Sequence, residues 1–377
     1  MQRMILSVPC PLGTESITAH QVRELGYETS EVVDGCVSFE GDEEAVALAN
    51  INLRSGERVL IRMGQFKALS FTELFDNVKK LPWENFIGKN DAFPVKGYSL
   101  KSKLFSVPDC QSIIKKAIVQ RLSEKYNISW FDETGPVYRV QFSIMKDIVS
   151  VYIDTTGAPL YKRGYRAEGV LAPLRETLAF SMIDVSRWRG DRPFIDPFCG
   201  SGTIPIEAAL YALNIAPGIN RSFESEKWGM FKEGHAYSDA REEARDNEQR
   251  DNKVEIFGSD IDPDAVSLAI ANAKKAKVAD KIRFFKADVK DVRAFKDKGI
   301  VMCNPPYGER LMDKKSVERL YAVMGRKFAE YENASKLILT SYEDFEKFYG
   351  RKADKKRKLY NGMLKCNLYM YFPEKTL

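Results

Sequence analysis

The fold of this chain is decided by residues 194–203, which read FIDPFCGSGT. A short apolar run enters a turn that holds Gly200 and Gly202, and residues 203–213 continue with the apolar spacing of a helix. A strand that passes through such a turn into a helix is typical of doubly wound α/β sheets, whose ligands bind beyond the carboxyl ends of the strands. The two glycines allow the backbone to approach a ligand closely.

Strand-like and helix-like segments continue to alternate towards the end of the chain. Four further apolar runs, separated by segments with helical spacing, lie at residues 254–258, 282–285, 300–302 and 336–340. Asn361 and Gly362 then separate two strand-like segments and predict a two-residue hairpin turn. We therefore predict a Rossmann-like sheet of seven strands, the last antiparallel to its neighbour. The charged residues 214–252 interrupt the alternation, and we predict mostly surface helix and loop there.

The N-terminal part follows a different pattern. Its first segment predicts the order β-α-β-β-α-β of a ferredoxin-like domain, with a tight turn at Asp34 and Gly35. The next segment predicts an α+β module that ends in two alternating strands. We divide the chain into a ferredoxin-like domain at 1–65, a second module at 66–155, a linker and leading helix at 156–192, and the α/β domain at 193–377.

Composition narrows the classes of function. The chain has 377 residues, of which 44% are hydrophobic, and it contains no apolar segment long enough to cross a membrane and no signal-peptide pattern. Its six cysteines are scattered, which indicates reduced thiols in the cytoplasm. Only two histidines are present, without ligand-spaced neighbours, so we predict no metal site and no histidine-based triad. A net charge of +5 permits a nucleic-acid partner without establishing one.

Acidic residues follow three successive strands of the predicted sheet. Asp196, Asp260 and Asp288 stand at these strand ends. We expect Asp260 to accept hydrogen bonds from ribose hydroxyls and Asp288 to meet an adenine amine. Taken singly, each is more often a helix cap or a solvated loop residue, but three on successive strand ends, with Asn304 on the fourth, are much rarer by chance. A nicotinamide site is disfavoured because Pro205 occupies the place of the third glycine. The pattern favours a methyl donor, whose transfer needs alignment more than acid–base chemistry.

Asn304, Pro305, Pro306 and Tyr307 follow the fourth strand. If the Asn304 side-chain oxygen and the Pro305 carbonyl each accept one N–H of a nucleobase amine, the nitrogen lone pair becomes localised and nucleophilic. The Tyr307 ring can stack on the same base. The alternative interpretation of these four residues is a strand that ends in a proline-rich turn.

The two motifs together resemble those of class I S-adenosylmethionine-dependent methyltransferases that act on exocyclic amines, with the second motif extending to residues 308–310. The N-terminal modules, with DTTG at 154–157 and YKRGYR at 161–166, resemble those of THUMP-domain RNA methyltransferases, in particular the bacterial 23S rRNA guanine-N2 methyltransferases. The resemblance covers nearly the whole chain. It implies RNA capture by the THUMP module, S-adenosylmethionine as cofactor, and two groups of site residues: Asp196, Gly200, Gly202, Asp260 and Asp288 for the cofactor, and Asn304, Pro305, Pro306 and Tyr307 for the base.

Other functions fit parts of the pattern. Similar enzymes methylate guanine N2 in tRNA, and the same four residues suit the N6 amine of adenine. Cytosine-C5 methylation would need a cysteine nucleophile, but Cys303 lies in a predicted buried strand and Cys199 in the cofactor loop. A non-catalytic RNA-binding scaffold is disfavoured by the two intact motifs. Eight basic residues are either an RNA-facing surface or ordinary solvated charges: Lys96, Lys101, Lys103, Lys115, Lys116, Lys162, Arg163 and Arg166.

Overall fold

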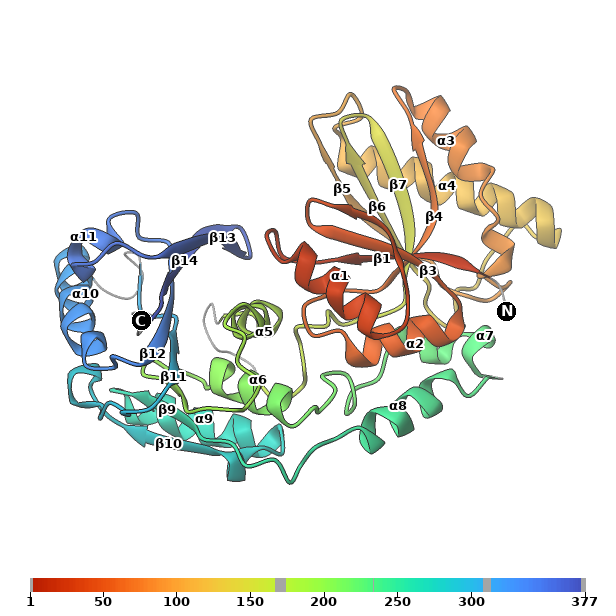
Figure 1. Cartoon of the computed structure of the whole chain (residues 1–377). Coiled ribbons are helices and arrows are strands. Elements are labelled where there is room, and N and C mark those ends of the chain that lie inside the picture. Colours follow the sequence, from red (N-terminus) through yellow and green to blue (C-terminus); the bar gives the residue numbers. More distant parts are fainter. Residues whose placement is uncertain (1–2, 167–173, 233, 308–312, 374–377) are drawn as a thin grey trace.

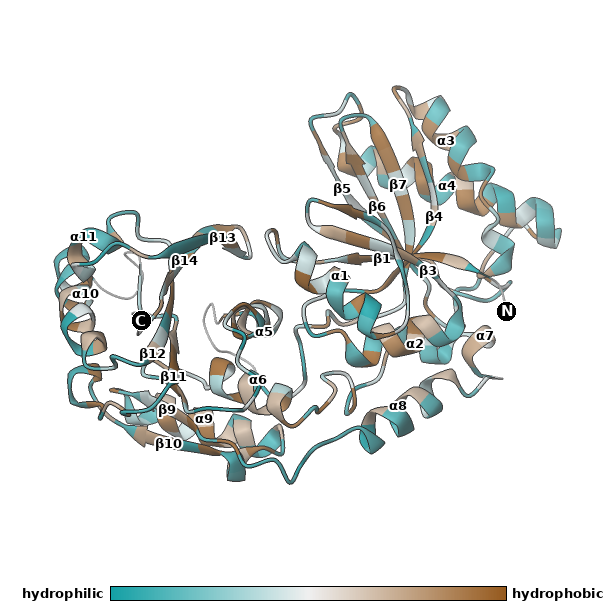
Figure 2. Ribbon diagram, in the orientation of Figure 1, coloured by the Kyte–Doolittle hydropathy of each residue, from teal (hydrophilic) through white to brown (hydrophobic). Residues whose placement is uncertain are grey.

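The computed structural model describes residues 3–166, 174–232, 234–307 and 313–373. The described chain forms two halves that lie side by side, each built on a seven-stranded sheet (Figure 1). The strands at the centre of each half are strongly hydrophobic, as the brown colour of β7 and β11 shows in Figure 2. Among the described helices, none is long and apolar enough to cross a membrane.

The N-terminal half begins with the predicted ferredoxin-like order, which the structure confirms. Its elements are β1 (Met4–Pro9), α1 (Glu15–Glu24), β2 (Thr29–Val33), β3 (Cys36–Gly41), α2 (Glu43–Asn52) and β4 (Leu60–Lys67). Val33 pairs with Cys36 across the expected two-residue turn, in which Gly35 has a φ of +74°. The second module then adds α3 (Phe71–Lys79), the short η1 (Trp83–Asn85), β5 (Val95–Leu100), α4 (Val107–Tyr126), β6 (Arg139–Met145) and β7 (Ile148–Asp154).

These two modules share one sheet, which the sequence did not predict. Strand β4 pairs antiparallel with β7, so the strand order is β2-β3-β1-β4-β7-β6-β5. Ile61 and Ile153 face each other in this pairing, and both are fully buried. The pairing joins segments about 90 residues apart in sequence, and the alternating apolar pattern of each strand does not specify its partner.

The C-terminal half confirms the predicted α/β sheet. Its elements are α5 (Glu176–Val185), β8 (Phe194–Asp196), α6 (Thr203–Ala212), β9 (Ile256–Asp260), α9 (Pro263–Lys275), η3 (Ala279–Lys281), β10 (Ile282–Lys286), η4 (Val289–Asp291), β11 (Gly299–Cys303), α10 (Lys314–Ala329), β12 (Ala334–Thr340), α11 (Phe345–Tyr349), β13 (Lys355–Asn361) and β14 (Leu364–Tyr371). The order is β10-β9-β8-β11-β12-β14-β13, and β14 runs antiparallel to both of its neighbours. All five residues of β11 are buried, as expected for a central parallel strand.

The final hairpin differs from the prediction by one residue. Asn361 remains in the ladder, opposite Leu364, so the turn consists of Gly362 and Met363. Gly362 supplies the positive φ of +64° that such a turn requires, and the Met363 side chain is 99% exposed.

The charged insertion at 214–252 forms helix and loop with mostly exposed or half-buried residues, as predicted, but its aromatic side chains are buried against the N-terminal half. It contains η2 (Glu224–Lys227), α7 (Gly229–Lys232) and α8 (Ala236–Asp246). Trp228 is fully buried and stacks on Tyr138 at a centroid distance of 4.3 Å. Tyr237 is also buried, and its hydroxyl accepts a hydrogen bond of 3.0 Å from the Asn50 side chain. The insertion thus fastens the two halves together.

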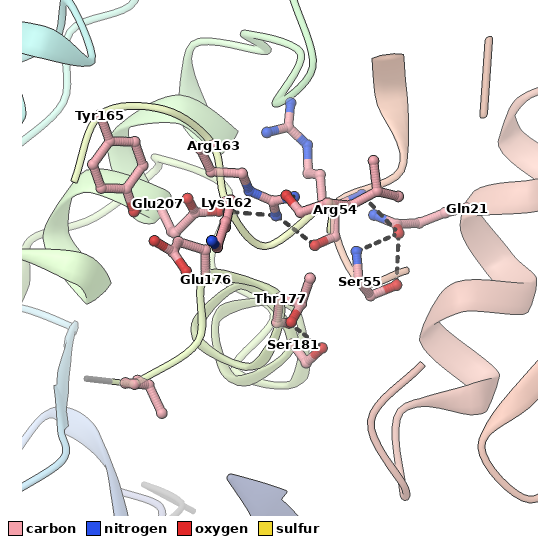
Figure 3. Close-up of polar contacts among 12 residues, drawn as sticks. Gln21, Arg54, Ser55, Lys162, Arg163, Tyr165, Glu176, Thr177, Ser181 and Glu207 are labelled. Carbon is pink, nitrogen blue, oxygen red and sulfur yellow. Dashed lines mark hydrogen bonds and ion pairs between the residues drawn. The ribbon is translucent and has the colours of Figure 1, made fainter. Parts of the chain in front are cut away.

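Buried polar contacts complete the joint between the halves. Asn50, which donates to Tyr237 of the insertion, also holds the end of the N-terminal half: its amide donates to Thr155 Oγ1 at 2.9 Å, and its oxygen accepts from Thr156 Oγ1 at 2.7 Å. Arg163 lies between the halves, where it donates to the Arg54 carbonyl at 2.6 Å and approaches Glu207 of α6 at 3.4 Å (Figure 3). Because these groups are removed from water, each contact costs more to break than an exposed one.

Candidate active site

The two predicted motifs flank the point at which the strand order of the C-terminal sheet reverses. Strand β8 lies between β9 and β11, and the chain leaves β8 and β11 at the same edge of the sheet. Asp196 therefore ends its strand beside the end of β9, while Asn304 follows the end of β11. In an open α/β sheet, a crevice at this switch point is the expected ligand site.

Asp260 connects the end of β9 to the glycine loop. One of its carboxylate oxygens accepts a hydrogen bond from the Gly200 N–H at 3.0 Å, and the other from the Asp262 N–H at 3.1 Å. Each carboxylate oxygen can accept a further donor, such as a hydroxyl. A side chain on Gly202 would come within 3.0 Å of Ala269, whereas one on Gly200 would meet nothing within 4 Å. The loop is therefore packed against α9 at Gly202 and open at Gly200.

Asp196 lies beneath this loop and is only 1% exposed. Its carboxylate accepts a hydrogen bond from the Phe198 N–H at 3.0 Å. Burial raises the pKa of Asp196 well above its usual range, and the nearby charge of Asp260 raises it further, although the Phe198 N–H opposes the shift. Asp196 is therefore placed to fix the conformation of the loop from below.

Asp288 stands at the same edge, after β10. It caps the short η4 by accepting from the Lys290 N–H at 3.1 Å, and it pairs with the Lys290 ammonium at 3.5 Å. Asp288 therefore is a helix cap, which was the alternative to a cofactor-binding role for this residue. The backbone next to it is tied to β9, because the Ala287 N–H donates to the Asp260 carbonyl at 3.0 Å. The structure brings Asp288 to the predicted edge with its side chain 31% exposed.

The Asn304 side-chain oxygen is buried and has no hydrogen-bond partner among the described residues. Buried acceptors are nearly always paired, so an orphaned one marks a place where a donor is missing. The residues around it are held firmly: Tyr321 donates to the Pro306 carbonyl at 3.4 Å and shares a hydrogen bond of 3.0 Å with Thr340. The Asn304 oxygen therefore has free capacity to accept a hydrogen bond from a ligand.

Tyr307 is held from behind by the final hairpin. The Cys366 thiol donates weakly to the Tyr307 hydroxyl, with a sulfur–oxygen distance of 3.9 Å. Burial raises the pKa of Tyr307, so the ring stays neutral at physiological pH. Residues 308–310, which the predicted motif includes, lie outside the described residues.

Sequence reasoning missed several residues that shape the site. Tyr321 lies in the apolar stripe of α10, where it looks like an ordinary core residue. Asn272 donates to the Ser201 carbonyl at 2.9 Å, and Arg166 donates to Thr203 at 2.9 Å and to Glu176 at 3.0 Å. The sequence indicates the contact between Arg166 and Glu176, because Glu176 stands at the start of an apolar helix, where a buried charge needs a partner.

For the eight basic residues, the sequence leaves open both an RNA-facing surface and ordinary solvated charges, and three of them have protein partners instead. Arg163 is buried in the joint, and Arg166 is engaged with Glu176 and Thr203. Lys115 pairs with Glu133. The charged heads of these three side chains have protein partners. Among the residues that the structure describes, no cluster of three or more His, Cys, Asp or Glu side chains could hold a metal ion.

Comparison with known families places this site in a class. Three family matches cover the chain: an RMKL-like methyltransferase domain at residues 163–370, a THUMP domain at 68–154 and an RlmL ferredoxin-like domain at 6–60. The fold and the site therefore define an S-adenosylmethionine-dependent RNA methyltransferase. The methyltransferase match spans more than half of the chain, and the chain belongs to the RMKL-like family.

Individual relatives agree with this assignment. The chain is 46% identical to "Putative RNA methyltransferase YpsC" of Bacillus subtilis, over 99% of this chain and 97% of that one. It is 32% identical to "Ribosomal RNA large subunit methyltransferase K/L" of Psychromonas ingrahamii, over 97% of this chain but only 49% of that one. The chain thus spans about half the length of the K/L enzymes that it matches.

Two solved structures match nearly the whole chain. The structure of SMU.472, titled "a putative methyltransferase complexed with SAH", has a TM-score of 0.94 and 41% identity, and it covers all of both chains. A "predicted N6-adenine-specific DNA methylase" from Listeria monocytogenes has a TM-score of 0.93 and 47% identity over 99% of this chain and 97% of that one. The complex with SAH, S-adenosylhomocysteine, identifies S-adenosylmethionine as the cofactor of this fold.

Proposed function

We propose that this enzyme methylates the exocyclic N2 amine of a guanine in 23S ribosomal RNA. The observation that carries the proposal is the Asn304 side-chain oxygen, a buried acceptor without a described partner at the switch point of the sheet. A nucleobase amine offers the N–H group that this acceptor lacks. The wider setting supports RNA as the substrate, since the chain belongs to a family of RNA methyltransferases and carries a THUMP domain.

Each predicted site residue has a defined task in this proposal. Asn304 and the Pro305 carbonyl accept the two N–H groups of the amine, which aims the nitrogen lone pair away from the base. Pro306 is fixed through its carbonyl by Tyr321, and the Tyr307 ring stacks on the base. S-adenosylmethionine supplies an electrophilic methyl group when bound. No general base with a shifted pKa is required, because alignment carries most of the rate.

The cofactor-binding residues divide into two groups. Gly200, Asp260 and Asp288 reach the open side of the strand ends, where we infer contacts to the methionine, ribose and adenine parts of the cofactor. Asp196 and Gly202 act from beneath: the first is buried under the loop and the second packs against α9. We assign them the task of holding the loop rather than touching the ligand. We also propose that the domains extend over residues 1–65, 66–155, 156–192 and 193–377. We further propose that the enzyme acts in the cytoplasm.

An adenine amine and a guanine in tRNA are alternative substrates for this site. The K/L relatives are named for ribosomal RNA, which supports 23S rRNA, but the chain spans only half of their length. The Listeria relative is titled an N6-adenine DNA methylase, and an adenine amine would satisfy Asn304 equally well. A tRNA guanine is also compatible with a THUMP domain. The ribosomal RNA therefore rests on the K/L relatives, and the guanine rests on the resemblance of the sequence motifs.

Nucleoside mass spectrometry of separated RNAs tests the proposal. We expect 23S rRNA from a deletion strain to lose one N2-methylguanosine, and complementation with the wild-type chain to restore it. The Asn304→Ala variant serves as the matched control, because it should fold and still fail to restore the modification. Loss of N6-methyladenosine instead, or loss of N2-methylguanosine from tRNA alone, would overturn the proposed substrate.

A further inference from the structure

One face of the N-terminal sheet is left uncovered. Helices α3 and α4 pack on one side of β4, β7, β6 and β5, and no described helix covers the opposite side (Figure 1). The uncovered side lines a groove of about 600 Å³. Along the paired strands, its side chains alternate with the buried core residues and include Arg62, Gln65, Tyr98, Gln141, Ser143, Met145, Ile148, Ser150 and Tyr152. We call this the open sheet face.

The open sheet face exposes large apolar and aromatic side chains. Tyr98 is 49% exposed, and Met145, whose sulfur lies 4.0 Å from the Tyr98 hydroxyl, is also 49% exposed. Leu100 and Ile148 continue the patch. An exposed apolar patch of this kind is typical of a surface that binds a partner. A flat surface with an exposed ring is suited to stacking against a planar group.

Unpaired cations surround this patch. Lys67, Lys96, Lys101, Lys103 and Lys146 are exposed, and none forms an ion pair with a described residue. Among the carboxylates nearby, Asp147 accepts the Lys103 backbone N–H at 2.7 Å. The groove is also lined by Asp34, by Glu31, which pairs with Arg62, and by Glu57, which pairs with Arg175.

The helical side of the same module carries both paired and unpaired cations. There Lys79 pairs with Glu124, Lys115 with Glu133 and Arg121 with Glu84. Lys80, Lys116 and Lys125 are also exposed there, without an ion pair to a described residue. What distinguishes the lysines around the open sheet face is therefore the exposed aromatic and apolar side chains beside them, an arrangement that suits an unpaired polyanion.

The groove leads from the open sheet face to the methyltransferase domain. Its far wall includes Arg175, Tyr360 and Gly362, the last two from the β13–β14 hairpin. The same hairpin holds Tyr307 through Cys366. A chain laid along the groove therefore ends beside the element that supports the base-binding motif.

We propose that the open sheet face binds an unpaired strand of the RNA substrate, with bases stacked on Tyr98 and phosphates on the surrounding lysines, and directs it towards the β13–β14 hairpin. An unpaired strand fits because its bases offer free faces to an aromatic ring, whereas a duplex offers mainly phosphates and the edge of its groove. The inference requires an RNA substrate and holds whichever base is methylated.

Fluorescence anisotropy with a labelled, mixed-sequence RNA of about 12 nucleotides, unpaired or annealed to its complement, tests this proposal. We expect Tyr98→Leu to weaken binding of the unpaired RNA about tenfold, the loss of one base–aromatic stack, with little effect on the duplex. Trp130→Leu is the matched control: Trp130 is 78% exposed in the same module, beyond the C-terminal end of α4. Unchanged binding by Tyr98→Leu, or equal losses for both RNAs, would overturn the stacking role.

Salt dependence tests the lysines separately. We expect Lys67→Gln and Lys96→Gln each to reduce the slope of log affinity against log salt by about 0.7, the value for one phosphate contact with a single strand. Lys116→Gln, on the exposed side of α4, should leave the slope unchanged. Unchanged slopes in the first two variants would assign the face to a different partner, such as a protein. Unaltered S-adenosylhomocysteine affinity confirms that each variant is folded, and nucleoside mass spectrometry tests the methylated base independently.

Discussion

Replacing Asn304 by alanine should slow methyl transfer strongly without weakening the fold. The side-chain oxygen is buried and makes no hydrogen bond to a described residue, so its removal breaks none. A buried, unpaired acceptor costs about 1–3 kcal/mol, and the alanine variant no longer carries this cost. We therefore expect the free energy of unfolding to stay level or rise. Methyl transfer should fall about 10²–10³-fold, as when one preorganised group is removed from a developing charge.

Three measurements separate these effects. Urea unfolding gives the free energy, calorimetric titration with S-adenosylhomocysteine gives cofactor affinity, and transfer of a labelled methyl group to total RNA from a deletion strain gives activity. Tyr321→Phe is the matched control, because its hydroxyl does make hydrogen bonds, to Thr340 and to the Pro306 carbonyl. That variant should lose about 0.5–1.5 kcal/mol for each bond and keep more of its activity.

The proposed role of Asn304 is contradicted if Asn304→Ala and Tyr321→Phe lose the same amounts of activity and stability. Undiminished methyl transfer by Asn304→Ala would remove the amine-accepting role. A stability loss of more than about 1 kcal/mol would mean that the oxygen has a partner in the folded protein and is not waiting for a substrate. A fall in S-adenosylhomocysteine affinity would place Asn304 in the cofactor site instead.

Three further predictions concern other residues. Because the folded protein holds the Asp196 proton more tightly than the unfolded chain does, ionisation of Asp196 lowers stability as pH rises from about 4 through the raised pKa; the thermal midpoint of Asp196→Asn should gain on that of the wild type across this window, and a constant difference would contradict it. Asp260→Ala should raise the dissociation constant for S-adenosylhomocysteine at least about tenfold by releasing the glycine loop, whereas Asp262→Ala, which removes only the cap of α9, should cost about 1 kcal/mol of stability and no affinity. Arg357 of β13 donates a hydrogen bond to the Gly13 carbonyl of the N-terminal half, so Arg357→Ala should speed amide hydrogen exchange around Gly13. Arg351→Ala, which removes an ion pair with nearby Asp354, should not. Equal exchange in the two variants would show that the Arg357 contact does not stabilise the joint.

Local patterns predicted the elements well because helix and strand periods are written in short stretches of sequence. The β-α-β-β-α-β order and the antiparallel β14 followed from such patterns. The shared sheet of the N-terminal half did not, because the pairing of Ile61 with Ile153 depends on a partner far away in the chain. The burial of Trp228 was missed for a similar reason: its neighbours are charged, and the surface that covers it lies on another module.

The site was predictable in its layout but not in its contacts. The carboxyl ends of parallel strands meet at one edge, so the strand pattern alone places Asp260 and Asn304 together. The sequence could not tell that Asp260 would clasp the Gly200 N–H, because both groups lie in loops without a period. It also misled at Arg163, where the basic pair with Lys162 looks like a surface feature. Its counter-charge, Glu207, stands 44 residues later in an apolar helix.

The buried joint through Asn50 and Arg163 has a consequence for how substrates are chosen. A hinge would let the N-terminal half swing relative to the methyltransferase domain, whereas a joint closed by buried hydrogen bonds, from Asn50 to Tyr237 and from Arg163 to Arg54, keeps the distance between the two halves constant. An RNA bound to both halves would then have to match this constant distance between the N-terminal half and the active site. An RNA whose target base stands at another distance from its captured strand must bend to be modified, and the bending energy falls on the RNA. Selectivity would then be set by spacing, and the letters around the target base would matter less than their distance from it.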